Sequence, residues 1–373
     1  MKLLVDSQVF DNQKFGGISR YFTELIKRLP KDKEIHHSVL YTQNFHLSEV
    51  YPILKKDPFF NNLFAYFKYG FSRRKRSKRF YELNRAHTLK LIAQQNFDIF
   101  IPTYYDTYFL DYLKNKPFVL TVYDMIHEIM KDHINPDEQL IENKRVLIEK
   151  ADKIIAISES TKNDILTLYP HIEEQKIEVV YLSESISIDN AIKVKLPERF
   201  ILFVGNRGAY KNFKFFIESI SSLLKNDYSL KVVCAGGGRL RNSEKRYLKS
   251  IGLEGKIIQK DFNDNELFHY YNLALCFVFP SMYEGFGIPV LEAMKSECPV
   301  VLANHSSFPE VAEDAGVYFE LENQKDLLEK ITQLVNDESK RKIYIEKGKI
   351  QAQKFSWDKM AKESINIYKS VIE

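Results

Sequence analysis

The chain has 373 residues, of which 45% are hydrophobic and 28% are charged, and its formal net charge is +4 at pH 7. That length is too great for one ordinary domain and suits two, each large enough for its own core. The small net charge neither favours nor excludes a nucleic-acid partner. No stretch approaches the ~18–20 consecutive apolar residues that a membrane-spanning helix needs.

The cysteines and the first residues bear on where the protein works. Cys234, Cys276 and Cys298 are an odd number without paired spacing or a nearby histidine cluster. This pattern disfavours a zinc site and favours reduced, buried thiols. The start, Met1–Ser7, lacks the longer apolar core of a secretion signal. We therefore expect a cytoplasmic protein, with association at a membrane surface left open.

The N-terminal region begins with a predicted strand, Lys2–Val9. A loop with the pair Gly16-Gly17 follows, and a helix is predicted from Arg20 onward. Strand, double glycine and helix form a layout that can cradle an anion, because the amides at a helix start point outward. A plain turn explains a glycine pair at least as well.

The segment Phe59–Arg79 has an unusual composition. Seven aromatic residues lie between Phe59 and Phe71, and Lys68–Arg79 holds seven basic residues and no acid. Rings that enter the interface and cations that meet phosphates suit an anionic membrane surface. RNA binding is a second interpretation, and a solvated basic helix after an aromatic core helix is a third.

Two short apolar runs, Phe97–Ile101 and Phe118–Val122, predict parallel strands of an N-terminal sheet. Asp124 and His127 follow the second run. Ligands of doubly wound folds lie beyond the carboxyl ends of the strands, so both residues are candidates for the site. A core or loop histidine with one satisfied hydrogen bond is the alternative for His127.

A polar, poorly patterned stretch, Ser183–Glu198, is interpreted as the interdomain linker. The strand Arg199–Val204 opens the second domain, and a glycine-containing loop with Arg207 and Lys211 follows it. A guanidinium binds phosphate oxygens in a fork and an ammonium binds as a point charge, so the pair suits a diphosphate. A surface turn with two solvated cations is the alternative.

The stretch Ser281–Met294 has the strongest local pattern in the chain. The apolar run Ala274–Phe279 predicts a buried strand before it, and Pro289 suits the first position of a helix after it. Gly285 and Gly287 let a ligand approach the backbone without a Cβ in the way.

Two carboxylates flank this glycine loop. Glu284 is predicted in the loop and Glu292 in the first turn of the helix. A phosphate at the helix start and hydroxyls on the carboxylates would together describe a nucleotide sugar. Two surface glutamates on a solvated loop are the alternative.

The residues EGFGIPVLEAM, from Glu284 to Met294, resemble the E-x7-E signature of the retaining GT-B glycosyltransferases of family 4. The resemblance continues through Pro299–Val301 and Ser307–Val311, which are similar to the strand and turn that follow this signature. Ile157–Ile165 and Phe355–Ala361 resemble two further segments of the family. The likeness is close in the second half of the chain and looser in the first.

The resemblance implies an α/β fold of GT-B type, in which two Rossmann-like domains with mainly parallel sheets face each other across a cleft. We expect an acceptor-binding domain at 1–185 and a nucleotide-sugar-binding domain at 186–354. The last helix, within 355–373, would cross back to the first domain.

The resemblance also assigns roles to residues. Lys211, Arg207 and the pair Gly16-Gly17 would face the donor diphosphate, and Phe262 would line the base pocket. Glu292 would hold the ribose hydroxyls, while Glu284 would hold donor-sugar hydroxyls or stabilise positive charge on the ring. The donor-binding set is completed by Gly285, Phe286 and Gly287.

The acceptor side departs from the family pattern. Members often carry His-Asp where this chain has Tyr123-Asp124, with the histidine near the reacting sugar. Asp124 and His127 are therefore both candidates for the catalytic set, beside Glu284. No Asp-x-Asp motif stands in the expected place, so we expect cations and amides to act in place of a metal and expect no cofactor.

By resemblance, the function is transfer of a sugar from a nucleoside-diphosphate sugar, of GDP-mannose or UDP-sugar type, with retention at the anomeric carbon. The acceptor would be a glycan or polyprenyl-linked glycan of a lipopolysaccharide, capsule or exopolysaccharide. We expect the enzyme at the inner face of the cell membrane, docked through Phe59–Arg79. A sugar-nucleotide epimerase, a non-catalytic nucleotide-sugar-binding scaffold and a nucleic-acid binder using Arg73–Arg79 stay open as alternatives.

Overall fold

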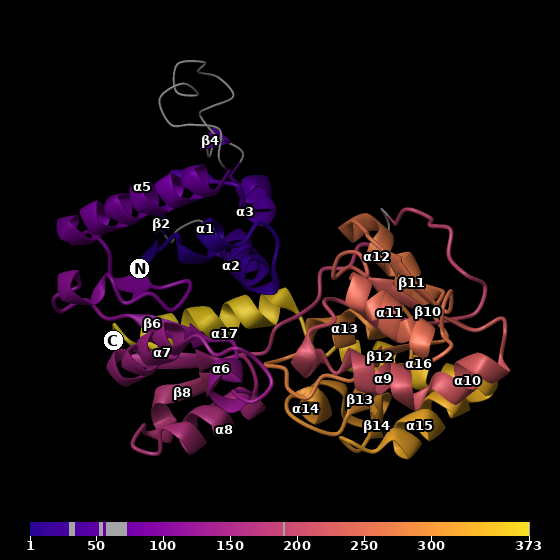
Figure 1. The fold of residues 1–373 in the computed structure, drawn as a ribbon. Coiled ribbons are helices and arrows are strands. Elements are labelled where there is room, and N and C mark those ends of the chain that lie inside the picture. Colours follow the sequence, from indigo (N-terminus) through magenta and orange to yellow (C-terminus); the bar gives the residue numbers. More distant parts are fainter. Residues whose placement is uncertain (30–33, 52–54, 57–72, 189–190, 373) are drawn as a thin grey trace. The chain divides into compact units, whose positions relative to one another are not determined.

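The computed structural model describes residues 1–29, 34–51, 55–56, 73–188 and 191–372 (Figure 1). It divides into two compact units: Met1–His127, Pro136–Leu182 and Trp357–Glu373 form unit 1, and Glu128–Asn135 with Ser183–Ser356 forms unit 2. The predicted membrane segment Phe59–Arg79 lies outside the described residues up to position 72. Over the ranges that the structure covers, no helix is both long and apolar enough to span a bilayer.

Unit 1 is built on parallel strands, and the adjacent strands Ile99–Ile101 and Val119–Val122 are buried on both faces. One sheet has the order β2-β1-β5 and another the order β6-β7-β8, and a parallel bridge between Phe100 and Phe118 joins them. The strands are β1 (Lys2–Val5), β2 (Glu34–His37), β5 (Ile99–Ile101), β6 (Val119–Val122), β7 (Lys153–Ala156) and β8 (Ile177–Val179), with a separate parallel pair of β3 (Tyr41–Thr42) and β4 (Lys55–Lys56).

The helices of unit 1 connect these strands, as parallel pairing requires. Ser158 caps α8, because its side chain accepts a hydrogen bond from Thr161 N at 3.0 Å. The helical elements are α1 (Gln8–Asn12), α2 (Gly17–Arg28), α3 (Phe45–Val50), α5 (Arg73–Gln94), η2 (Leu110–Tyr112), α6 (Ile126–Ile129), α7 (Glu138–Lys150), α8 (Glu159–Leu168), η3 (Glu174–Lys176) and α17 (Trp357–Ser370).

The predicted strand Lys2–Val9 is wrong in its second half. Strand β1 ends at Val5, and Gln8–Asn12 forms the short helix α1. Asp6 stops the strand because its buried carboxylate accepts hydrogen bonds from Thr103 N at 2.8 Å and from Gln8 N at 3.3 Å. These contacts turn the chain away from the sheet.

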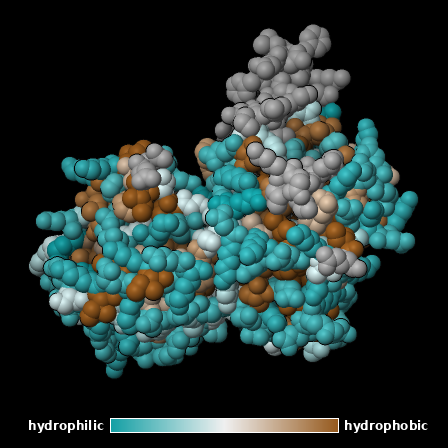
Figure 2. Space-filling model, turned by 180° about the vertical axis from the view of Figure 1, so that it is seen from behind, coloured by the Kyte–Doolittle hydropathy of each residue, from teal (hydrophilic) through white to brown (hydrophobic). Residues whose placement is uncertain are grey.

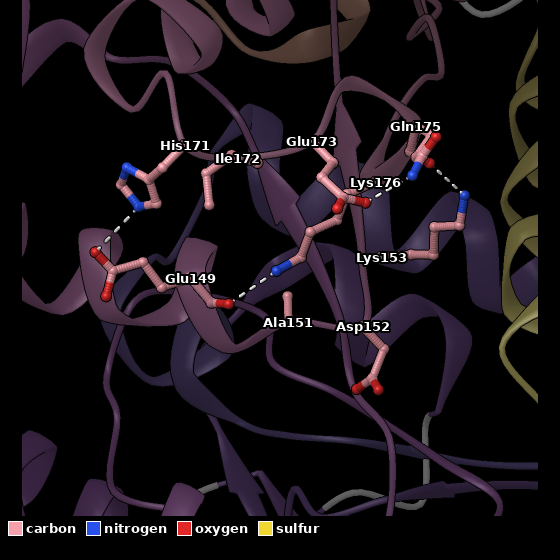
Figure 3. A pocket seen from close by; sticks show the side chains of 9 residues that line it. All are labelled: Glu149, Ala151, Asp152, Lys153, His171, Ile172, Glu173, Gln175 and Lys176. Atoms are coloured by element: carbon pink, nitrogen blue, oxygen red, sulfur yellow. Dashed lines mark hydrogen bonds and ion pairs between the residues drawn. The ribbon is translucent and has the colours of Figure 1, made fainter.

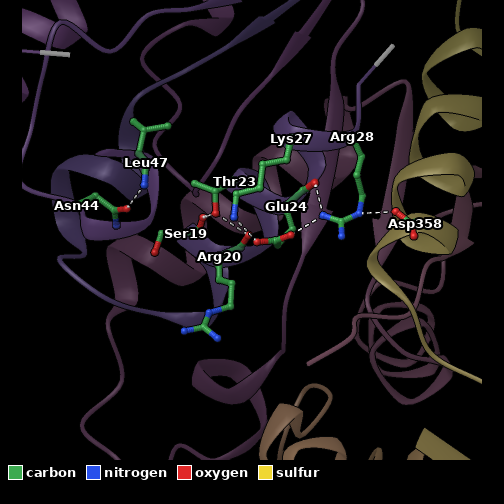
Figure 4. Close-up of polar contacts among 9 residues, drawn as sticks. All are labelled: Ser19, Arg20, Thr23, Glu24, Lys27, Arg28, Asn44, Leu47 and Asp358. Atoms are coloured by element: carbon green, nitrogen blue, oxygen red, sulfur yellow. Dashed lines mark hydrogen bonds and ion pairs between the residues drawn. The ribbon is translucent and has the colours of Figure 1, made fainter. Parts of the chain in front are cut away.

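The C-terminal helix α17 packs on α2 within unit 1 (Figure 4). Arg28 Nε donates to Asp358 Oδ1 at 2.6 Å, and Arg28 also pairs with Glu24 one turn earlier. Deeper in the contact, the hydroxyls of Tyr21 and Ser364 lie 3.5 Å apart, both buried. The last helix therefore belongs to the fold of the first half of the chain.

Unit 2 contains one six-stranded parallel sheet with the order β11-β10-β9-β12-β13-β14. This is the doubly wound order 3-2-1-4-5-6, in which the direction of winding reverses between the first and fourth strands. The strands are β9 (Phe200–Val204), β10 (Lys231–Ala235), β11 (Ile257–Lys260), β12 (Cys276–Phe279), β13 (Val300–Ala303) and β14 (Gly316–Phe319). Every residue of β9, β12 and β13 is buried.

Helices cover this sheet with their apolar faces. The amphipathic helix α15 (Gln324–Asn336) buries Leu327, Ile331 and Leu334 at helical spacing. The remaining elements are η4 (Ala209–Lys211), α9 (Phe213–Ser219), α10 (Ser221–Asn226), α11 (Asn242–Ser250), α12 (Asp264–Asn272), α13 (Ile288–Lys295), α14 (Phe308–Ala312), η5 (Glu313–Ala315) and α16 (Glu338–Ala352).

The surface is mostly hydrophilic on the face seen in Figure 2. A large hollow of about 870 Å³ lies in unit 1, at the amino ends of β7 and β8 (Figure 3). Its charged groups are paired within it: Lys176 Nζ donates to the Glu149 carbonyl at 2.8 Å, and Lys153 Nζ donates to the Gln175 carbonyl at 2.6 Å. The hollow is thus at the edge of the sheet opposite to the one where ligands of such folds bind.

Candidate functional site

The switch point of unit 2 lies between β9 and β12, and the loops that follow these two strands carry predicted donor residues. These two strands are neighbours, with Ile201 paired to Cys276 and Leu202 to Phe277. Their loops are tied together by a hydrogen bond from Met282 N to the Tyr210 carbonyl at 2.8 Å. The predicted donor residues from the two loops are therefore brought to one place.

Lys211 and Glu284 form an ion pair at this switch point. Lys211 Nζ lies 2.5 Å from Glu284 Oε1, and both side chains are 15% exposed. The ammonium also lies over the rings of Tyr210 and Phe279. Burial by itself would lower the pKa of Lys211, but the neighbouring Glu284 carboxylate outweighs it and raises the pKa above its ordinary value. The lysine is therefore a permanent cation beside Glu284.

The loop that carries Glu284 is fixed from beneath by two serines that follow β13. Ser306 Oγ donates to the Glu284 carbonyl at 2.6 Å, and Ser307 Oγ donates to the carbonyls of Glu284 and Phe286 at 3.0 and 2.9 Å. Phe286 is 2% exposed and its ring packs against Phe355. Phe286, which was predicted to bind the donor, thus has its side chain packed in the core of unit 2.

Gly287 closes the loop and starts α13. Its φ is +94°, and a Cβ there would meet the Phe308 ring at 3.2 Å, so glycine is required for both reasons. Helix α13 begins at Ile288, which puts Pro289 at the second helical position instead of the predicted first. Gly285 lies in the same loop, partly exposed.

Glu292 lies in the second turn of α13, and its predicted place in the first turn is wrong because the helix starts no earlier than Ile288. Tyr271 OH donates to Glu292 Oε2 at 3.0 Å. The pKa of Tyr271 is raised well above its ordinary value, mainly by burial and in second place by the negative charge of Glu292. The tyrosine hydroxyl therefore keeps its proton and donates the hydrogen bond. The carboxylate is oriented while it remains partly exposed.

The Arg207 guanidinium binds other groups of the protein. Its side chain is 3% exposed, Nε lies 2.8 Å from Glu244 Oε1, and its terminal nitrogens donate to the carbonyls of Gly236, Gly238 and Arg239. The same glycine turn receives Phe262, whose ring lies 3.1 Å from where a Gly236 Cβ would be. Arg207 therefore holds the turn beside the predicted base pocket.

The pair Gly16-Gly17 begins α2 in unit 1, earlier than the predicted helix start at Arg20. Gly16 is the residue before the helix and Gly17 its first residue. A Cβ on Gly16 would lie 2.2 Å from Gln13 Oε1. The preceding Phe15 is 66% exposed, and its ring lies 5.4 Å from that of Phe45.

Asp124 and His127 both follow β6, as predicted: Asp124 lies in the turn after the strand, and His127 lies in the short helix α6. Asp124 Oδ1 accepts from Ile126 N at 3.1 Å, and its carbonyl accepts from buried Lys144 at 3.0 Å. His127 Nδ1 accepts from Asp137 N at 3.1 Å. Both side chains are partly exposed.

Tyr123, which stands where the family often has histidine, is buried. It is 5% exposed, and its hydroxyl donates to the Thr103 carbonyl at 3.3 Å. The pKa of Tyr123 is raised well above its ordinary value, mainly by burial and to a smaller extent by the neighbouring Tyr105 and Tyr21. This tyrosine is a packed, neutral residue of the unit 1 core.

Sequence reasoning missed a buried polar network at the carboxyl end of β1. Asp6 is fully buried, and its two oxygens accept from Thr103 Oγ1 and Gln8 Nε2, both at 2.6 Å. Burial raises the pKa of Asp6 to about 6 and that of Asp11 to about 7. An acidic residue directly after a buried strand was the only signal in the sequence that could have marked it.

The two units are each a Rossmann-like parallel α/β fold, and the structural neighbours of the chain are GT-B glycosyltransferases. HepE of Anabaena, in complex with UDP and glucose, is similar with a TM-score of 0.69, 13% identity, and 99% of each chain covered. Sucrose-phosphate synthase of Thermosynechococcus elongatus is similar with a TM-score of 0.74, 15% identity, and 99% and 98% of the two chains covered. At these identities, the likeness establishes the fold alone.

The family follows from the sequence matches. Residues 15–182 match the family model described as Glycosyltransferase Family 4, and residues 185–351 match the one described as Glycosyl transferases group 1. Together they account for most of both units, and the chain belongs to the family 4 glycosyltransferases.

Curated relatives are similar over part of their length. O-antigen chain mannosyltransferase B of Escherichia coli is 28% identical over 234 residues, which cover 60% of this chain and 61% of that protein. The N-acetylgalactosamine-N,N'-diacetylbacillosaminyl-diphospho-undecaprenol 4-alpha-N-acetylgalactosaminyltransferase of Campylobacter jejuni is 28% identical over 228 residues, 59% and 60% of the two chains. The matches thus span about 60% of the length of these relatives.

Proposed function

We propose that this protein transfers a sugar from a nucleoside-diphosphate sugar to a glycan or lipid-linked acceptor, with retention and without a metal ion. The observation that carries the proposal is the buried Lys211–Glu284 pair, 2.5 Å apart, at the switch point between β9 and β12. The names of the relatives, two of which refer to O-antigen mannosyl transfer and to an undecaprenol-linked acceptor, support a role in surface polysaccharide synthesis.

The chemistry of this site suits departure of a nucleoside diphosphate. The leaving group gains negative charge in the transition state, and a permanent cation that is already in place stabilises it without reorganisation. Lys211 supplies that cation, and the amides at the start of α13 add partial positive charge. When the diphosphate takes Lys211, the Glu284 carboxylate is released to accept donor-sugar hydroxyls or to face positive charge on the sugar ring.

Glu292 and its surroundings suit the nucleoside. A carboxylate accepts two hydroxyls at once, which matches a ribose. Tyr271 orients the Glu292 carboxylate from the buried side. Asp124 and His127 are proposed to act on the reacting sugar, and Gly16-Gly17 to face the donor phosphates. The inner face of the cell membrane is the proposed place of action.

A panel of nucleoside diphosphates and their sugars, read by thermal shift and followed by a transfer assay with the stabilising donor, tests this function. We expect one base to raise the melting temperature and its sugar derivative to be consumed only when a glycan acceptor is added. Consumption of the donor by epimerisation without an acceptor would contradict the proposal.

One observation favours a second candidate, a non-catalytic protein that binds nucleotide sugars. The buried Tyr123 hydroxyl is turned to the Thr103 carbonyl, so it cannot perform the role of a histidine near the reacting sugar. The same assay separates the candidates, since donor binding without turnover over any acceptor would establish the second.

A further inference from the structure

The loop that follows β13 supplies two hydroxyls to the backbone of Glu284. Ser306 Oγ donates to the Glu284 carbonyl at 2.6 Å and accepts from Glu284 N at 3.2 Å. Ser307 Oγ donates to the same carbonyl at 3.0 Å and to the Phe286 carbonyl at 2.9 Å. Both polar groups of the Glu284 backbone therefore have side-chain partners, and all of these residues belong to unit 2.

The serine loop is anchored to the sheet. Asn304 N donates to the Phe319 carbonyl at the end of β14 at 2.9 Å, and Ser307 is fully buried. Glu284, in contrast, lies in a loop with two glycines, and a glycine loop has much conformational freedom to lose. The two hydroxyls therefore tie a loop of flexible composition to a fixed part of the fold.

Ser306 has an unusual backbone conformation. Its φ is +56°, in the left-handed region that favours glycine because a Cβ is crowded there. Residues other than glycine are kept in this region by the structure around them, and they cluster at functional sites. A glycine would adopt the same conformation with less strain, but it would provide no hydroxyl for Glu284 N and the Glu284 carbonyl.

Lys211 and the serines hold different parts of Glu284. Lys211 Nζ lies 2.5 Å from the carboxylate, and the diphosphate of the proposed donor would take this ammonium. The serines bind the backbone and are not among the groups proposed to bind the donor. When the donor arrives, the side chain of Glu284 therefore loses its ion pair while its backbone keeps both hydroxyls.

We propose that Ser306 is a positioning residue for Glu284 in the donor-bound state. Its hydroxyl keeps the Glu284 backbone in place after the diphosphate has taken Lys211, so that the released carboxylate remains where it can meet the donor sugar. This inference rests on the proposed function. A group that is already oriented lowers the barrier by an entropic saving, so the hydroxyl acts on turnover and not on the affinity for a nucleoside diphosphate.

Three substitutions of Ser306 separate the hydroxyl from the strain. Ser306→Gly removes the hydroxyl and relieves the left-handed strain, whereas Ser306→Ala removes the hydroxyl and keeps the strain. Ser306→Thr keeps a hydroxyl, but its branched Cβ adds strain. Glu322→Gly is the matched control, because Glu322 is an exposed residue with a φ of +63° in the turn before α15.

The full chain is measured in three ways: unfolding in denaturant, binding of UDP and GDP by isothermal titration, and transfer from the donor that the nucleotide panel identifies. Among the three variants, we expect Ser306→Gly to be the most stable and Ser306→Thr the least. We expect kcat to fall at least about tenfold in Ser306→Gly and Ser306→Ala and to stay within about threefold of the wild type in Ser306→Thr. The affinity for the nucleoside diphosphate should stay as in the wild type, as should kcat in Glu322→Gly.

A role of Ser306 in folding alone predicts the opposite order of activity, with Ser306→Gly the most active variant and Ser306→Thr the least. That order would overturn the proposal. So would wild-type kcat in Ser306→Gly and Ser306→Ala, an equal loss in all three variants, or a loss of nucleoside-diphosphate affinity as large as the loss of kcat.

The same measurements keep this role and the proposed function apart. Sugar transfer by the wild type that no substitution of Ser306 changes leaves the proposed function standing and removes the role of Ser306. A wild-type chain that transfers no sugar from any donor removes the proposed function, and the role of Ser306 with it.

Discussion

Lys211 and Glu284 are 73 positions apart in the chain, yet their charged atoms lie 2.5 Å apart and are shielded from solvent. Each neutralises the other while no donor is bound. A diphosphate must therefore compete with Glu284 for the ammonium, and binding of the donor releases the carboxylate. Donor binding and the release of the Glu284 carboxylate from its ion pair are therefore coupled.

The first prediction concerns this competition. Glu284→Gln removes the competing charge, so we expect nucleoside diphosphates to bind roughly 3- to 10-fold more tightly while sugar transfer falls strongly. Isothermal titration and initial rates measure the two effects. Lys211→Ala is the opposite variant and should weaken nucleotide binding. Wild-type transfer in both variants and in Glu292→Ala would show that the site is wrongly assigned.

The second prediction concerns the orientation of Glu292. Tyr271→Phe removes the one hydrogen bond from Tyr271 OH to this carboxylate, and we expect the donor KM to rise roughly 5-fold, with kcat little changed. Glu292→Ala should raise it more, because it removes the charged acceptor itself. Tyr228→Phe, at a tyrosine that is 86% exposed, is the control. An unchanged KM in Tyr271→Phe would mean that Tyr271 does not position the carboxylate.

The third prediction distinguishes two roles for Arg207. If its guanidinium bound the diphosphate, Glu244→Gln would release it and tighten binding. Because Arg207 is buried and donates to the glycine turn, we expect Glu244→Gln to lower the free energy of unfolding by about 2 kcal/mol and to weaken nucleotide binding.

The control for this variant is Glu338→Gln, which breaks an exposed ion pair with Lys342. Such a pair contributes little, so stability and binding should stay as in the wild type. Tighter nucleotide binding in Glu244→Gln would assign Arg207 to the phosphate after all.

The fourth prediction concerns pH. Burial raises the pKa of Asp11 from 3.8 to about 7, so the folded state holds a proton that the unfolded state has lost between these values. Stability therefore falls as pH rises from about 4 to about 7 and stays lower above it.

Asp11→Asn should remove this loss and raise the free energy of unfolding at pH 8 by up to roughly 4 kcal/mol, because a difference of one in pKa corresponds to about 1.4 kcal/mol. In the wild type, Asn84 Nδ2 and Ser7 Oγ both donate to the Asp11 carboxylate. An asparagine side chain could still accept from Asn84 through its oxygen and donate to the Ser7 hydroxyl oxygen through its amide. Denaturant unfolding at pH 5 and pH 8 measures the change, with exposed Asp111→Asn as control. An equal slope with pH in Asp11→Asn and the wild type would contradict the raised pKa.

The sequence by itself determined the elements and their type. Apolar runs such as Phe200–Val204 and Cys276–Phe279 are buried strands, and the glycine loop and helix after the second one are found as predicted. Local pattern suffices there because burial of a strand and the start of a helix depend on a few adjacent residues. The same reasoning misplaced Lys2–Val9 and the helical turn of Glu292, since element ends are set by contacts that lie far along the chain.

Only the tertiary structure decided which polar groups bind other groups of the protein and which face a site where a ligand could bind. The order of strands brings Lys211 to Glu284 and takes Arg207 to Glu244 and the glycine turn, although both cations follow the same strand. A pocket of about 190 Å³ at the carboxyl ends of β1 and β5 is lined by residues from four segments of the chain. No spacing in the sequence connects Gln8 with Tyr104 or Asn143, which are among them. The reason is physical: a side chain's partners depend on sheet order and on burial, and neither is a local property of the chain.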